Sequence, residues 1–119
     1  MAKYVDGFVL PVPKANIEAY RKMAETACKV WMELGALDYV ECIAEDVKPG
    51  KLTSFPQSVN LEPDEVVVFA WIIYESRAAR DRINEKAMKD PRMVSIGPDG
   101  VPFDGKRMVY GGFEMLVKA

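Results

Sequence analysis

One acidic side chain, Asp6, stands in an otherwise apolar stretch near the start of the sequence. A carboxylate buried in an apolar strand costs free energy unless it is hydrogen-bonded or paired with a cation. Two interpretations follow from its position. Asp6 either belongs to a ligand site, where a buried carboxylate can act as a general base, or forms a structural ion pair with Arg92 or Arg107.

The segment from Phe103 to Arg107 is the second candidate for chemistry. Asp104-Gly105 is typical of a turn, and the two cationic residues that follow it could hold an anionic group. The alternative is a structural loop that leads into the last strand and is closed by an Asp–Arg pair. Both interpretations remain open at the level of the sequence.

Aromatic side chains recur along the chain and could line an apolar pocket between a sheet and its helices, or simply fill a core. They are Trp31, Phe69, Trp71, Tyr74, Tyr110 and Phe113. Tyr110 precedes Gly111-Gly112, and adjacent glycines in a strand indicate a bulge or the close approach of a backbone or ligand. Arg92 ends a basic stretch that is otherwise typical of a solvated helix end. The candidate ligand-binding residues are therefore Asp6, Trp71, Arg92, Asp104, Arg107 and Tyr110.

The chain contains no histidine, which excludes every mechanism that uses one. This excludes histidine-based triads, histidine zinc sites and a proximal-histidine haem ligand. The two cysteines, Cys28 and Cys42, are too few for a cysteine-rich zinc or iron–sulfur site, and we expect both to be buried, reduced thiols. A Mg²⁺ or Mn²⁺ site made of carboxylates alone is still open but has no motif in the sequence. We therefore expect no metal and no cofactor.

Composition narrows the partners further. The net charge of −2 argues against a nucleic-acid-binding protein, which needs a dense positive surface. The longest apolar run, Val66 to Tyr74, is far shorter than the roughly 20 residues of a membrane-spanning helix. The first residues show no signal-peptide pattern, so we expect a cytoplasmic protein.

Hydrophobic periodicity predicts four strands and two helices. The first helix would begin after Asn16 and end before Gly35, and Ser76 would cap the second. On the second helix, Arg80 would face water. The run from Val66 to Tyr74 is typical of a strand buried on both faces. The predicted strands cover residues 3–12, 36–47, 65–75 and 108–117, and the predicted helices cover residues 17–34 and 77–89.

The resulting order, β-α-β-β-α-β, predicts an α+β, ferredoxin-like fold with a four-stranded antiparallel sheet, formed by a single domain over residues 1–119. Right-handed crossovers place both helices on the same face of the sheet. The first and third strands are nonetheless apolar on both faces, so the uncovered face predicts an interface. A second copy of the chain, packed through the open sheet faces, is the simplest partner.

Several segments resemble the YbaA-like family of uncharacterised bacterial proteins. They are residues 4–9, 35–37 with 40–42, 90–93, and 102–108 with 110–114. The resemblance covers nearly the whole chain, and it implies a dimeric α/β-barrel fold of the ferredoxin-like superfamily and a bacterial source. It implies no activity. The wider superfamily includes cofactor-independent monooxygenases, chlorite dismutase-like haem proteins and small-molecule-binding proteins, which is analogy at the level of fold.

Two classes of function remain open. The first is a homodimeric domain that binds a small molecule or has a regulatory role without catalysing a reaction. The second is a cofactor-independent oxygenase or isomerase with a pocket between sheet and helices, in which Asp6 or Glu41 acts as the base and Arg107 stabilises an oxyanion. A ligand-sized cavity faced by Asp6 and Arg107 would favour the second class.

Overall fold

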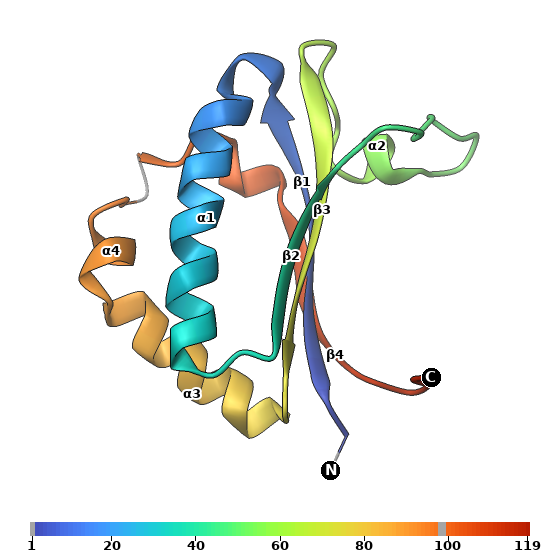
Figure 1. Cartoon of the computed structure of the whole chain (residues 1–119). Helices are drawn as coiled ribbons and strands as arrows, with labels where there is room; N and C mark the ends of the chain where they lie inside the picture. The colour runs from blue at the N-terminus through green and yellow to red at the C-terminus, as the bar shows by residue number, and fades with distance from the viewer. Residues whose placement is uncertain (1, 98–99) are drawn as a thin grey trace.

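The sheet has four antiparallel strands in the order β2-β3-β1-β4. The computed structural model describes residues 2–97 and 100–119 (Figure 1). The main elements are β1 (Tyr4–Pro13), α1 (Ile17–Leu34), β2 (Asp38–Ile43), β3 (Glu65–Tyr74), α3 (Arg77–Lys89) and β4 (Val109–Glu114). The short helices between them include η1 (Lys14–Asn16), α2 (Phe55–Ser58), α4 (Pro91–Val94) and η3 (Gly105–Arg107). The predicted ferredoxin-like βαββαβ fold is confirmed.

Local signals set the ends of the helices as expected. Gly35 follows α1 with a φ of +117°, a left-handed conformation that favours glycine. The Ser76 hydroxyl accepts a hydrogen bond from the Ala79 backbone N–H at the start of α3. Asn16 precedes α1 but does not cap it with its side chain. Its amide instead donates to the Pro102 carbonyl, which ties the start of α1 to the loop before β4.

Both long helices cover the same face of the sheet, as Figure 1 shows. Two apolar clusters fill the space between these helices and the sheet. One gathers around Val30, Ile72 and Ile83, and the other around Leu10, Val12 and Val68. The strand register explains which residues point inward. Asp6 lies opposite Ile72, and Leu10 lies opposite Val68, so their side chains share the helix-covered face.

The opposite face of the sheet carries apolar side chains with no long helix over them. Strand alternation sends Phe69, Trp71, Val109 and Phe113 to this side. Phe69 is 43% exposed and Phe113 is 63% exposed. The short helix α2 lies on this side, where Phe55 packs against Phe69 at 5.9 Å between ring centroids. We call this surface the open face, and it matches the apolar second face that the sequence predicts.

Glycines on β1 and β4 are covered by an aromatic ring on the open face. Gly7 lies directly opposite Gly111 in the ladder. A Cβ at either position would lie 3.7–3.8 Å from the ring of Phe113. The ring therefore replaces the packing that two missing side chains would have supplied.

Three expectations about these elements are wrong. The edge strands are shorter than predicted, because β2 spans Asp38–Ile43 and β4 ends at Glu114, after which Leu116 is 95% exposed. Cys42 is exposed rather than buried, because β2 is an edge strand whose alternation turns that residue to the open face. Arg80, placed in solvent by the helix pattern, has a side chain that is only 20% exposed.

The described residues also bear on membrane insertion. None of their helices is both long enough and apolar enough to cross a bilayer.

Candidate functional site

A cavity of about 460 Å³ lies between the covered face of the sheet and the helices α1 and α3. This volume is within the range of small-molecule sites. Most of its wall is apolar, with four methionines and a set of aromatic residues. The aromatic residues include Phe8, Tyr20, Trp31, Tyr39, Phe103 and Tyr110. Among the described residues, the charged side chains that line it are Asp6, Glu41 and Arg80.

Asp6 is paired with Arg80 at one end of this cavity. The Arg80 Nη1 atom donates to Asp6 Oδ1 at 3.2 Å, and its Nη2 atom donates to the Tyr4 hydroxyl at 3.2 Å. The guanidinium also lies 4.9 Å from the centre of the Tyr4 ring, a cation–π contact. The Asp6 side chain is 8% exposed. The expected alternatives for its partner, Arg92 and Arg107, are therefore both wrong.

The paired glycines of β4 have a specific role in this arrangement. Gly112 lies opposite Asp6, and a Cβ at Gly112 would fall 2.4 Å from the Tyr4 hydroxyl oxygen. No real Cβ tolerates that distance, so glycine is required for Tyr4 to lie where it meets Arg80. The close approach that the sequence indicated is made by a tyrosine ring.

A second polar group, Glu41, lines the same cavity from β2. Its Oε2 atom accepts a hydrogen bond of 2.8 Å from the Tyr39 hydroxyl, and its Oε1 atom accepts one from the Tyr20 hydroxyl on α1. Burial, followed by the nearby Glu41 charge, raises the pKa of both tyrosines well above the ordinary value. Both hydroxyls therefore stay protonated, and Glu41 acts as the acceptor in both bonds.

A third polar cluster joins α1, β3 and α3. Trp31 Nε1 donates to the Tyr74 hydroxyl at 3.1 Å and to Asn84 Oδ1 at 3.0 Å, and the Tyr74 hydroxyl lies 3.2 Å from the same Asn84 oxygen. Burial, followed by the Asp6 charge, raises the pKa of Tyr74. This cluster supplies neutral hydrogen-bonding groups to the wall of the larger cavity.

A smaller cavity of about 260 Å³ lies on the other side of Glu41, between α1 and β2. Tyr20, Tyr39 and Glu41 line both cavities and so form a shared wall. Ala24 lines only the smaller cavity, and Ala27, one turn further along α1, lines only the larger one. The two alanines provide matched positions from which to narrow one cavity at a time.

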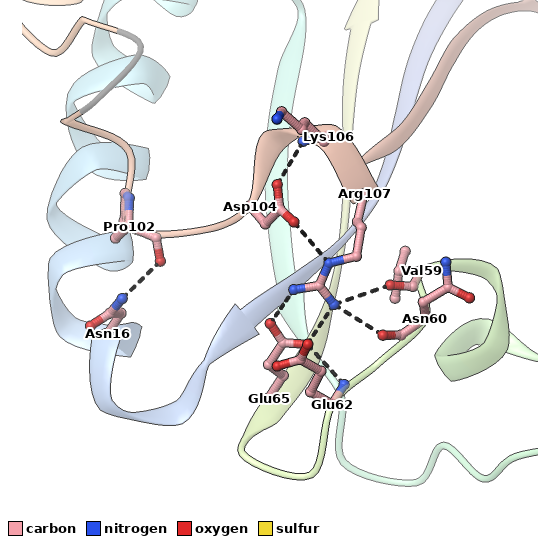
Figure 2. Close-up of polar contacts among 9 residues, drawn as sticks. All are labelled: Asn16, Val59, Asn60, Glu62, Glu65, Pro102, Asp104, Lys106 and Arg107. Atoms are coloured by element: carbon pink, nitrogen blue, oxygen red, sulfur yellow. Dashed lines mark hydrogen bonds and ion pairs between the residues drawn. The ribbon is translucent and has the colours of Figure 1, made fainter.

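Arg107 is held away from both cavities by a network shown in Figure 2. Its Nη1 and Nη2 atoms donate to the two carboxylate oxygens of Glu65 at 2.7 and 2.6 Å, and its Nε atom donates to Asp104 at 3.0 Å. Nη1 also reaches the backbone carbonyls of Val59 and Asn60. Nearly all of its donors are engaged, which favours the structural interpretation of this loop.

The six candidate residues therefore divide into separate regions. Asp6 and Tyr110 share the larger cavity, where Tyr110 stacks on Phe8 at 6.4 Å. Trp71 borders it too, but strand alternation turns its side chain to the open face, where it packs on Phe69. The remaining three line neither cavity. Arg107 pairs with both Asp104 and Glu65, and Arg92 pairs at the surface with Asp90 and Glu33.

Arg80 has no clear signature as a site residue in the sequence, whereas Glu41 is one of the two candidate bases that the sequence predicts. Arg80 lies on the margin of the α3 stripe formed by Ala79, Ile83 and Ala87, a position from which a long side chain can turn inward. Glu41 lies two residues after Tyr39, so strand alternation places the two side chains on one face. Within the described part of the chain, no cluster of three or more Cys, Asp or Glu side chains could hold a metal ion.

Comparison with known proteins places this geometry in a family. Residues 3–105 match the family described as "Protein of unknown function (DUF1428)". The chain belongs to this family. It is 53% identical to the uncharacterized protein YbaA of Escherichia coli (strain K12) over 115 residues, which cover 97% of each chain, and equally similar to YbaA of Shigella flexneri. The resemblance noted in the sequence is confirmed.

Solved structures with low sequence identity share the fold. A dimeric ferredoxin-like protein from an uncultured marine organism covers all of both chains with a TM-score of 0.63 at 12% identity. A putative antibiotic biosynthesis monooxygenase from Nitrosomonas europaea has a TM-score of 0.55 at 12% identity, over 97% of this chain and 91% of that one. At this identity the likeness shows the architecture alone.

The Asp6–Arg80 pair gives a first testable prediction. We expect Asp6→Asn to lower the free energy of unfolding by about 2 kcal/mol, because it leaves a largely buried guanidinium without its buried carboxylate partner. Asp81→Asn is the matched control. Asp81 also lies near Arg80, at 3.0 Å, but its side chain is 59% exposed, so the loss should stay below about 0.5 kcal/mol. Equal losses in urea unfolding would contradict the assignment.

The Glu65–Arg107 pair predicts a dependence of stability on acid. Hydrogen bonding to Arg107 lowers the pKa of Glu65 below its ordinary value of 4.5. The unfolded state therefore binds the proton more readily, and the stabilisation is present above pH 4.5 and is lost as the pH falls through the lower folded-state pKa. One such group changes the free energy of unfolding by at most about 1.4 kcal/mol per pH unit.

We expect Glu65→Gln to be less stable at pH 7 and to show a flatter decline in stability between pH 5 and pH 3, measured by urea unfolding. Glu18→Gln, at a surface pair whose glutamate side chain is 76% exposed, should leave the wild-type decline unchanged. An unaltered acid slope in Glu65→Gln would show that this pair does not carry the effect.

Proposed function

We propose that this protein is a homodimeric domain that binds a small, mainly apolar molecule in the larger cavity. The observation that carries the proposal is the cavity itself, about 460 Å³ in volume and lined by aromatic and methionine side chains with a few placed polar groups. Closely packed protein interiors leave few voids larger than a water molecule. A space of this size between sheet and helices is typical of a ligand site.

The polar groups of the wall are arranged to orient a ligand. Asp6 with Arg80 marks one part of the wall and Glu41 with its two tyrosines another, while Trp31, Tyr74 and Asn84 form a third hydrogen-bonded group. Most of these side chains are fixed by partners on a different element. A preorganised wall lowers the cost of binding, because fewer side chains lose freedom when the ligand enters.

The homodimer is supported by the open face. Its exposed apolar side chains lie on a sheet with no long helix over it, and an apolar surface of this kind marks an interaction site. The architecture is shared with a marine protein described as dimeric and ferredoxin-like. A second copy that packs its own open face against this one would bury both surfaces through a twofold interface. A cytoplasmic location remains our prediction from the sequence.

A cofactor-independent enzyme is the alternative, and the geometry favours it less. The carboxylates of Asp6 and Glu41 do face the cavity, as a base would need to. The residue expected to stabilise an oxyanion, Arg107, is instead bound to Glu65 and Asp104. Arg80, the cation that does line the cavity, is already paired with Asp6. The polar groups of the cavity wall are therefore better suited to binding and orienting a ligand than to catalysing a reaction.

Narrowing each cavity separately tests the binding proposal. With 2-naphthylmethanol as a neutral aromatic probe, we expect Ala27→Leu to weaken binding at least tenfold, because the added side chain occupies the larger cavity. Ala24→Leu adds the same volume to the smaller cavity from the same helix, and both alanines are 8% exposed. Calorimetric titration should find its affinity within about twofold of wild type. No binding to the wild type, or equal losses in the two variants, would overturn the proposal.

The dimer makes a separate prediction about assembly. We expect a dimer at low micromolar concentration in sedimentation velocity, and Phe69→Glu should shift it to a monomer by placing a charge in the interface. Val94→Glu is the control, since Val94 is 60% exposed on α4, away from the open face. A monomeric wild-type protein would contradict the assembly.

A further inference from the structure

Glu41 differs from the other buried or half-buried acids of this fold in having no cationic partner. Asp6 is paired with Arg80, and Glu65 with Arg107. Across residues 2–97 and 100–119, the ion pairs include none that involves Glu41. Its only hydrogen-bonding partners in this part of the chain are the hydroxyls of Tyr20 and Tyr39. Glu41 is therefore a carboxylate stabilised by neutral donors.

The charged lining of the larger cavity is consequently unbalanced. It consists of two carboxylates and one guanidinium, and the guanidinium is used by Asp6. The imbalance of one negative charge therefore resides on Glu41. In surroundings of low polarity an unmatched charge attracts an opposite one more strongly than it would in water.

The oxygens of Glu41 retain capacity for a ligand. Each carboxylate oxygen can accept two hydrogen bonds, and each accepts only one here from a tyrosine. Because both tyrosines are hydrogen-bonded to it, the carboxylate is held in one orientation at the cavity wall. A donor on the ligand therefore meets a fixed acceptor.

The neighbouring aromatic rings favour the same kind of group. Tyr20 and Tyr39 line the cavity beside Glu41, and Phe103 packs edge-on against Tyr20 at 5.8 Å between ring centroids. The faces of aromatic rings attract cations, most strongly where water is excluded. A carboxylate framed by aromatic rings is chemically suited to an organic ammonium group.

We propose that the ligand of the larger cavity is an organic cation, an apolar or aromatic molecule whose single protonated amine binds the Glu41 carboxylate. This inference rests on the proposed function, because it specifies the chemistry of the same cavity. It disfavours an anionic ligand held by Arg80, since the charge of that guanidinium is already matched by Asp6 at 3.2 Å and by Asp81 at 3.0 Å.

Three probes of one shape test the charge preference in the full-length protein. They are 2-naphthylmethylamine, which is a cation at pH 7, neutral 2-naphthylmethanol, and anionic 2-naphthoate. We expect the amine to bind wild type at least tenfold more tightly than the alcohol, because a charge-assisted hydrogen bond to a carboxylate replaces a neutral one. The carboxylate probe should bind more weakly than the alcohol.

Glu41→Gln then tests whether this residue carries the preference. The variant keeps the size of the side chain and removes its charge, so the amine-to-alcohol affinity ratio should fall to about threefold or less while alcohol binding persists. If Glu41→Gln does not fold, as judged by circular dichroism, Tyr39→Phe provides the second measurement. It keeps the carboxylate but frees its orientation, and should lower the amine-to-alcohol affinity ratio, with both affinities measured in the variant.

The outcomes separate this inference from the proposed function. Similar affinities for amine and alcohol in wild type, a preference for the carboxylate probe, or an unchanged ratio in Glu41→Gln would each overturn the cation assignment. Alcohol binding that is blocked by Ala27→Leu would still stand as evidence for the cavity. Failure of all three probes to bind wild type would overturn both.

Discussion

Both long helices of this protein lie on one side of its sheet, and most other features follow from that constraint. Crossovers between strands of one sheet are right-handed, so the two βαβ units of the chain place α1 and α3 on the same face. The covered face then holds the core and the larger cavity. The opposite face keeps its apolar side chains, with the short helix α2 on that side. A single topological rule thus produces both a candidate binding site and a candidate interface.

Three acidic side chains in largely apolar surroundings are stabilised in two ways in this fold. Asp6 is matched by an arginine from α3, and Glu65 by an arginine from the segment before β4. Glu41 receives two tyrosine hydroxyls instead. The first two pairs join elements that are distant in sequence and act within the fold, because each leaves little charge unmatched. The third leaves a charge available in a cavity, which is why the inference about ligand chemistry rests on Glu41.

The comparisons give this protein a family but no activity. Its relatives of 53% identity are described as uncharacterized, and the structural neighbours share its architecture at 12% identity. The proposed function therefore depends on the site itself rather than on analogy. Members of the family can be compared by whether they have the same arrangement of Asp6, Glu41 and Arg80 in an aromatic cavity.

The βαββαβ order, the ends of both long helices and the apolar character of the open face could be predicted from the sequence alone. These depend on local signals such as Gly35 and Ser76 and on the hydrophobic period, which act over a few residues. It also excluded every mechanism that needs histidine. The family resemblance was legible for the same reason, because it is carried by contiguous motifs.

The contacts between the candidate site residues could be found only in the folded structure. The sequence paired Asp6 with Arg92 or Arg107, whereas the partner is Arg80, because the packing of α3 against the sheet turns a long side chain inward. It allowed Asp6 and Arg107 to face one cavity, whereas the folded chain brings Met108 and Tyr110 to the cavity of Asp6 and pairs Arg107 with Glu65. Partners of buried charges are chosen by register and helix placement, and these are properties of the assembled chain that no short stretch of sequence contains.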